Sequence, residues 1–150
     1  MEARVERETP EILLVDDDSN DVAVALRAFR RNELADRVKV LRDGAELLEY
    51  LQVPAEDSSM GPPPVPKLIL LDLKMPRLDG KAVLRALRSD PRTHEVPVVM
   101  VSWSDDHDDV RECYSLGANS YVVKSADASR PGQYLVDVAR RWLDASETIR

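Results

Sequence analysis

Five short apolar runs recur along this chain, and each is followed by a segment whose apolar residues have helical spacing. The runs lie at residues 12–15, 38–41, 68–71, 96–101 and 120–123. A short, continuous apolar run that ends abruptly in polar residues is typical of a strand buried on both faces. Five such strands alternating with five helices predict an α/β fold with a parallel sheet covered on both sides.

The helical segments have apolar residues three and four positions apart. We expect Ser19 or Asn20 to cap the first helix, because both side chains can accept a hydrogen bond from an unpaired amide of the first turn. The second helix is expected around Leu47–Leu51. The later helices are expected at about 79–89, 105–116 and 131–145.

One connection is unusual in its composition. Residues 52–67 contain five of the ten prolines and are longer than most connections in a compact domain. A tolerated surface insertion is the preferred interpretation, and a functional loop is the alternative. The expected organisation is a flexible N-terminal tail (1–10), one domain (11–145) and a C-terminal tail (146–150), without an output domain.

Charge and composition exclude several classes of protein. The formal charge is −7, from 28 acidic and 21 basic residues, which disfavours binding to nucleic acid. No apolar stretch approaches the roughly 20 residues of a membrane span. The single cysteine, Cys113, cannot form an internal disulfide, and the charged N-terminus does not resemble a signal peptide. The sequence predicts a soluble, cytoplasmic protein that binds neither DNA nor membranes.

Chemistry-bearing residues stand where the predicted strands end. The first strand ends in Asp16, Asp17 and Asp18, the third in Asp72, the fourth in Ser102 and the fifth in Lys124. In an open parallel sheet, ligands bind beyond the carboxyl ends of the strands. We therefore expect acids, a hydroxyl and an amine to share one rim.

This set of residues is suited to phosphoryl chemistry. Clustered carboxylates repel one another unless a cation intervenes, and oxygen ligands with room for water suit Mg²⁺. A carboxylate can also act as a nucleophile and become an aspartyl-phosphate, whose oxygens a hydroxyl and an ammonium would bind. A helix-capping role remains the alternative for any single strand-end aspartate.

Other site types fit less well. A calcium-binding loop that starts at Asp16 would have Asp21 at its glycine position and Arg27 at its glutamate position. No glycine-rich phosphate loop is present, and neither His94 nor His107 has a partner at ligand spacing. We expect both histidines to be solvated and Cys113 to fill the core.

Four segments together resemble the receiver domain of bacterial two-component response regulators. The resemblance extends from about Glu11 to Asp144. The segments that carry it are Ile12–Asp18, Leu70–Pro76 with Asp79-Gly80, Val99–Ser102 and Tyr121–Lys124.

Within this family the sequence is most similar to stand-alone regulators that serve phytochrome-type histidine kinases. That closer similarity lies in Ser102–Ser104, in Val123–Ser125, in the proline-rich insertion and in Ser89–Thr93.

The resemblance implies a flavodoxin-like, doubly wound sheet of order 2-1-3-4-5. It also implies a role for each site residue. Asp72 would accept a phosphoryl group from the histidine of a kinase, with a bacteriophytochrome as the candidate. Ser102 and Lys124 would bind phosphoryl oxygens, and Tyr121 would be the aromatic switch that turns inward with Ser102.

The resemblance further implies a Mg²⁺ site beside Asp72. Asp17 would bind the ion directly, Asp16 mainly through water, and Lys74 through its backbone carbonyl. The protein would then be a phosphoacceptor that signals by a change of surface, and it would catalyse only its own phosphorylation and dephosphorylation.

Two positions depart from the common pattern of the family. Ser125 stands where proline usually follows the lysine, so we expect a trans Lys124–Ser125 bond, since a cis bond before a non-proline residue costs about 2.5–4 kcal/mol. Trp103 stands where a small residue usually follows the switch hydroxyl. We expect its ring to restrict access of water and small phosphodonors to the site.

Two other functions are alternatives to the phosphorylation switch. One is a degenerate receiver that binds a partner without phosphorylation, which the intact Asp17, Asp72, Ser102 and Lys124 disfavour. The other is a Mg²⁺-dependent phosphohydrolase, for which no general acid or base is evident beside Asp72. We also expect a homodimer formed partly by the last helix, where Tyr134 lies at the edge of the apolar stripe.

Overall fold

The computed structural model describes residues 10–51 and 65–148. The predicted proline-rich connection and N-terminal tail therefore lie almost wholly outside the described residues. Along the chain, the elements are β1 (Ile12–Val15), α1 (Ser19–Arg31), η1 (Ala35–Arg37), β2 (Val38–Leu41), α2 (Gly44–Leu51), β3 (Leu68–Asp72), α3 (Gly80–Ser89), β4 (Val98–Ser102), α4 (His107–Ser115), β5 (Ser120–Val123) and α5 (Gln133–Thr148).

The five strands form one parallel sheet in the order β2-β1-β3-β4-β5. The predicted doubly wound α/β fold and its strand order are therefore confirmed. The order reverses between β1 and β3, and the carboxyl ends of these two strands open a crevice at one edge of the sheet.

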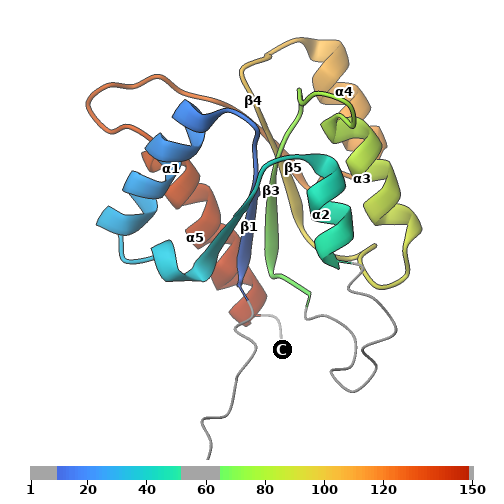
Figure 1. Cartoon of the computed structure of the whole chain (residues 1–150), viewed down its shortest axis with the longest axis horizontal. Coiled ribbons are helices and arrows are strands. Elements are labelled where there is room, and N and C mark those ends of the chain that lie inside the picture. The colour runs from blue at the N-terminus through green and yellow to red at the C-terminus, as the bar shows by residue number, and fades with distance from the viewer. Residues whose placement is uncertain (1–9, 52–64, 149–150) are drawn as a thin grey trace, which may run out of the picture.

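Two apolar cores cover the sheet, because successive strand residues point to opposite faces. Helices α1 and α5 lie on one face, and α2, α3 and α4 lie on the other (Figure 1). On β1, Ile12 and Leu14 pack on the α1/α5 side, whereas Leu13 and Val15 pack on the opposite side. The fully buried strands β1, β3 and β4 give a rigid support for the groups that follow them.

The helix boundaries differ from the prediction in places. The cap of α1 is Asp18, whose side chain accepts a hydrogen bond from the Asp21 amide at 2.9 Å, so Ser19 and Asn20 are helical residues rather than caps. All four residues from Asp17 to Asn20 are of types that can cap a helix, and tertiary packing decides which of them does so. Helix α5 begins at Gln133 and continues to Thr148, into the predicted C-terminal tail.

Gly80 brings the start of α3 against the end of β3. A Cβ atom at this position would lie 2.5 Å from the carbonyl oxygen of Asp72. The Gly80 amide donates a hydrogen bond to the Leu73 carbonyl at 2.8 Å. Because Gly80 has no side chain, the start of α3 can pack this closely against the backbone at the end of β3.

Among the described residues, none of the helices combines the length and the apolar character that crossing a membrane would require. The Lys124–Ser125 bond is trans, as the energy argument predicts.

Candidate functional site

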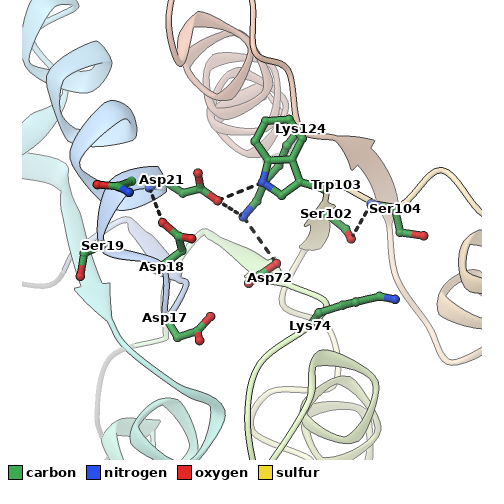
Figure 2. A pocket seen from close by; sticks show the side chains of 11 residues that line it. Asp17, Asp18, Ser19, Asp21, Asp72, Lys74, Ser102, Trp103, Ser104 and Lys124 are labelled. Atoms are coloured by element: carbon green, nitrogen blue, oxygen red, sulfur yellow. Dashed lines mark hydrogen bonds and ion pairs between the residues drawn. The ribbon is translucent and has the colours of Figure 1, made fainter.

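The predicted strand-end residues come together at the carboxyl edge of the sheet. Figure 2 shows Asp17, Asp72, Ser102 and Lys124 around one pocket. This pocket has a volume of about 750 Å³. Asp17 follows β1, Asp72 and Ser102 are the last residues of β3 and β4, and Lys124 follows β5. The parallel pairing of these strands accounts for the convergence of four groups that lie far apart in sequence.

Asp72 is the central carboxylate of this pocket and is only 7% exposed. Burial disfavours its charged form and the nearby Asp16 adds repulsion. Together they raise the pKa of Asp72 to about 7, despite the attraction of Lys124. A cation bound beside Asp72 would lower this pKa and favour the ionised carboxylate, which is the nucleophilic form.

Three carboxylates are placed to hold such a cation. One oxygen each from Asp16, Asp17 and Asp72 lie within 4.8 Å of one another. Asp17 is exposed, whereas both oxygens of Asp16 already have partners: the Asp18 amide at 2.9 Å and the Lys124 ammonium at 2.9 Å. This pattern favours Asp17 as a direct ligand and a water-mediated role for Asp16.

The donor set fits a small, hard divalent cation, because all of its candidate ligands are oxygens. Lys74 also lines the pocket, and its ammonium lies 3.9 Å from Asp109. The predicted role of the Lys74 backbone carbonyl remains a prediction.

Lys124 is the buried cation of the site, with a side chain only 4% exposed. Its Nζ lies 2.9 Å from Asp16 Oδ2, 2.7 Å from Asp21 Oδ2 and 3.6 Å from Asp72 Oδ1. Burial opposes its charge, yet the hydrogen bonds to Asp21 and Asp16 outweigh burial and raise the pKa of Lys124 above its usual value. The ammonium is therefore charged and close to Asp72.

Ser102 connects the pocket to the loop before α4. Its Oγ accepts a hydrogen bond from the Ser104 amide at 3.0 Å. The Ser104 carbonyl in turn accepts a hydrogen bond from the Tyr121 hydroxyl at 2.8 Å. The predicted hydroxyl and the predicted switch tyrosine are thus linked through one residue that the sequence did not single out.

Ser104 also contacts the next helix. Its Oγ donates to Asp109 Oδ2 at 2.8 Å, and Asp109 pairs with Lys81 of α3 at 3.0 Å. The hydrogen bond from Ser104 is the main reason that the pKa of Asp109 is lowered. A displacement of Ser104 would therefore reach both α3 and α4.

Sequence reasoning missed Asp21, which binds both Lys124 and the indole of Trp103. The sequence signal that could have found it is its position in the first turn of the helix that follows the strand-end acids. Trp103 is 55% exposed and lies at the rim of the pocket, as predicted.

Four other residues that the sequence indicates as notable do not line this pocket. Cys113 is fully buried, and burial raises its pKa to about 11, which agrees with its predicted core role. His94 and His107 lie outside the residues that line the pocket. Tyr134 is half-buried against the α1/α5 core, so its ring offers less free surface than the sequence pattern indicates.

Comparison with known proteins agrees with this geometry. The model of the response regulator receiver domain matches residues 12–134. The probable methanogenesis regulatory protein FilR2 of Methanothrix harundinacea is 34% identical over 132 residues, which cover 88% of this chain and 83% of FilR2. The response regulator Rcp1 of Synechocystis is 32% identical over 133 residues, which cover 89% of this chain and 88% of Rcp1.

Two solved structures show the same architecture. The phosphorylated cyanobacterial phytochrome response regulator RcpA has 34% sequence identity and a TM-score of 0.78, with 92% of this chain and 96% of RcpA covered. The Mn(2+)-bound form of Rcp1 has 34% identity and a TM-score of 0.67, with 77% of this chain and 81% of Rcp1 covered. The chain therefore belongs to the response regulator receiver domain family and is similar to phytochrome response regulators.

Proposed function

We propose that this protein is a response regulator that accepts a phosphoryl group on Asp72 from a histidine kinase. A phytochrome-type kinase is the candidate donor. Phosphorylation then changes the surface that a partner protein reads. The similarity to RcpA and Rcp1 supports the choice of kinase class.

The observation that carries the proposal is that Asp72 shares one pocket with both acidic and phosphoryl-binding groups. Asp16 and Asp17 each place an oxygen within 4.8 Å of an Asp72 oxygen. Ser102 and Lys124 line the same pocket, and Lys124 Nζ lies 3.6 Å from Asp72 Oδ1. A cation could bind the carboxylates while the hydroxyl and the ammonium bind the oxygens of a phosphoryl group on Asp72.

In the proposed reaction, an oxygen of Asp72 attacks the phosphorus of a phosphohistidine. A new P–O bond forms while the P–N bond breaks, and the electron pair of that bond returns to the imidazole nitrogen. Lys124 and Ser102 bind the phosphoryl oxygens as the group is transferred. The kinase histidine leaves in its unphosphorylated form.

Asp17, Asp16, Asp72 and the carbonyl of Lys74 would hold Mg²⁺ beside the acceptor. The ion would neutralise the clustered carboxylates and favour the ionised form of Asp72. The acid-rich pocket fits this ion, and a Mn(2+)-bound form is known for the similar Rcp1.

In the proposed output, Ser102 turns toward the phosphoryl group and gives up its hydrogen bond from the Ser104 amide. Tyr121, bonded to the Ser104 carbonyl, then moves with the loop. The proposed readers are a downstream protein and a second copy of this chain, rather than DNA or a membrane.

Exposure to acetyl phosphate and Mg²⁺, followed by intact mass spectrometry, tests the proposal. One stable phosphoryl group per chain is expected for the wild type and none for Asp72→Asn. No labelling of the wild type would favour a degenerate receiver. Continuous release of inorganic phosphate would instead indicate a phosphohydrolase.

The kinase assignment needs a separate experiment. A purified bacteriophytochrome kinase, labelled with radioactive ATP in the dark and after red light, is mixed with this protein. Rapid transfer of label to the wild type and none to Asp72→Asn is expected. Labelling by acetyl phosphate without transfer from the kinase would contradict only the choice of donor.

A further inference from the structure

Asp21 is a carboxylate in the pocket that has no part in the proposed metal site. It lies in the first turn of α1, and its Oδ2 accepts a hydrogen bond from Lys124 Nζ at 2.7 Å. The same oxygen accepts a second hydrogen bond from Trp103 Nε1 at 3.2 Å. One atom thus joins the buried ammonium of the site to an indole at its rim.

The contact with Lys124 is shielded from water. The side chains of Lys124 and Asp21 are 4% and 23% exposed. Hydrogen bonds between charged groups are stronger than neutral ones, and they are screened less by salt when they are buried. Asp21 is therefore a main determinant of the position of Lys124 Nζ.

An ammonium has three N–H donors, and the short contacts of Lys124 account for two of them. These go to Asp21 at 2.7 Å and Asp16 at 2.9 Å, whereas Asp72 Oδ1 lies at 3.6 Å, beyond hydrogen-bond distance. In this structure Lys124 is bound by its other acidic partners rather than by the phosphoacceptor.

Figure 2 shows that the contacts of the ammonium to Asp21 and to Asp72 run in different directions. Asp21 lies on α1, whereas Asp72 lies at the end of β3. Movement of Nζ toward a phosphoryl group on Asp72 therefore lengthens its contact with Asp21.

We propose that Asp21 is a positioning residue that competes with the phosphoryl group on Asp72 for the Lys124 ammonium. The inference rests on the proposed phosphorylation of Asp72. Trp103 reports this competition, because its indole shares the oxygen that Lys124 gives up. Asp21 thereby sets how strongly the unphosphorylated state is favoured.

Trp103 is placed to turn this local change into a change of surface. It lines the phosphoacceptor pocket and also a second, mainly apolar cavity of about 250 Å³ between α1 and the segment that precedes α5. Asp21 and Lys124 line both cavities as well. Loss of the Lys124–Asp21 contact therefore alters the wall between them.

Beryllofluoride with saturating Mg²⁺ stands in for the phosphoryl group in the test. All proteins carry Trp142→Phe, so that the emission comes from Trp103 alone. Removing one charged hydrogen bond from Lys124 should free it for the ligand, and Asp21→Asn is expected to bind beryllofluoride about tenfold more tightly. The change in Trp103 emission on binding should be much smaller in this variant.

Asp18→Asn is the matched control. It removes the same charge from the same pocket, and Asn retains the capping role that Asp18 has at the start of α1. Its affinity for beryllofluoride should change less than about twofold, since a surface charge acts weakly at a distance. Asp21→Ala repeats the test without an acceptor for the indole, and circular dichroism verifies the fold of each variant.

The outcomes separate the two proposals. A wild type that binds no beryllofluoride contradicts the proposed function itself. A wild type that binds it, with equal or weaker binding by both Asp21 variants, overturns the competition. An equal gain in Asp18→Asn would also overturn it, because the effect would then be one of net charge.

Discussion

The hydroxyl of Tyr121 donates a hydrogen bond to the carbonyl of Ser104 at 2.8 Å, and so connects the edge strand β5 to the loop between β4 and α4. The Ser104 amide meanwhile donates to Ser102 Oγ. The predicted switch tyrosine and the predicted phosphoryl-binding hydroxyl are therefore connected through the amide and the carbonyl of Ser104.

Tyr121→Phe should weaken this coupling. Loss of one partly buried hydrogen bond is expected to lower the free energy of unfolding by about 0.5–1.5 kcal/mol. The amide of Ser104 should exchange its hydrogen faster, which mass spectrometry can follow. In the control Tyr114→Phe, the lost hydroxyl accepts a bond from the Tyr121 amide instead, so exchange at Ser104 should not change.

Mg²⁺ binding should depend on Asp17 much more than on Asp18. Asp17 belongs to the cluster of three carboxylates, whereas the Asp18 side chain caps α1. Titration followed by Trp103 emission should show a loss of affinity of at least about tenfold in Asp17→Asn and a small one in Asp18→Asn. The reverse order would contradict the assignment of the metal ligands.

The strand-end residues could be predicted because the geometry of a parallel sheet determines where they meet. Asp72, Ser102 and Lys124 each stand at the end of an apolar run, so their common edge follows from strand direction alone. The roles of Asp21 and Ser104 could not be predicted in the same way. They depend on the rotation of α1 and on the path of the β4–α4 loop, which tertiary packing decides.

The sequence was also insufficient where several residues satisfy the same rule. Each residue from Asp17 to Asn20 can cap a helix, and only the packing of α1 on the sheet selects Asp18. Tyr134 illustrates a second limit, since a residue at the edge of an apolar stripe can turn either way. Its ring lies against the core beside Ser125 and Leu135, where burial raises its pKa.

The stability of the metal-free protein should depend on the charge of Asp72. A carboxyl whose pKa is near 7 when folded, against 3.8 ordinarily, makes folding less favourable as pH rises from about 4 through 7. In EDTA at pH 8, Asp72→Asn should be more stable than the wild type by about 1 kcal/mol or more. Urea unfolding at pH 5 should show a smaller difference in the free energy of unfolding between Asp72→Asn and the wild type.

Added Mg²⁺ provides the control for this prediction. The ion should bind the ionised wild type and stabilise it. The stability advantage of Asp72→Asn at pH 8 should therefore decrease or change sign. A gap that is the same at both pH values in EDTA would mean that the ionisation of Asp72 is not its cause.

Trp103→Ala should open the rim of the pocket. The indole is exposed, donates a hydrogen bond to Asp21 and lines the same pocket as Asp72. Its removal should increase both the rate of labelling by acetyl phosphate and the rate of autodephosphorylation, by about two- to tenfold. Unchanged rates in both assays would show that the ring does not restrict access.

Self-association should involve β5 and the helices beside it. Tyr114 of α4 and Val123 of the edge strand β5 are 48% and 43% exposed. Helix α5 carries exposed charged side chains at Asp137, Arg140 and Arg141. Apolar area within a polar rim is typical of an interface. Light scattering at tens of micromolar, with and without beryllofluoride, should give twice the chain mass for the wild type. Val123→Lys should give the monomer mass, whereas Val65→Lys, which alters a valine that is 44% exposed before β3, should leave the dimer intact. A monomer mass for the wild type under both conditions would contradict the prediction.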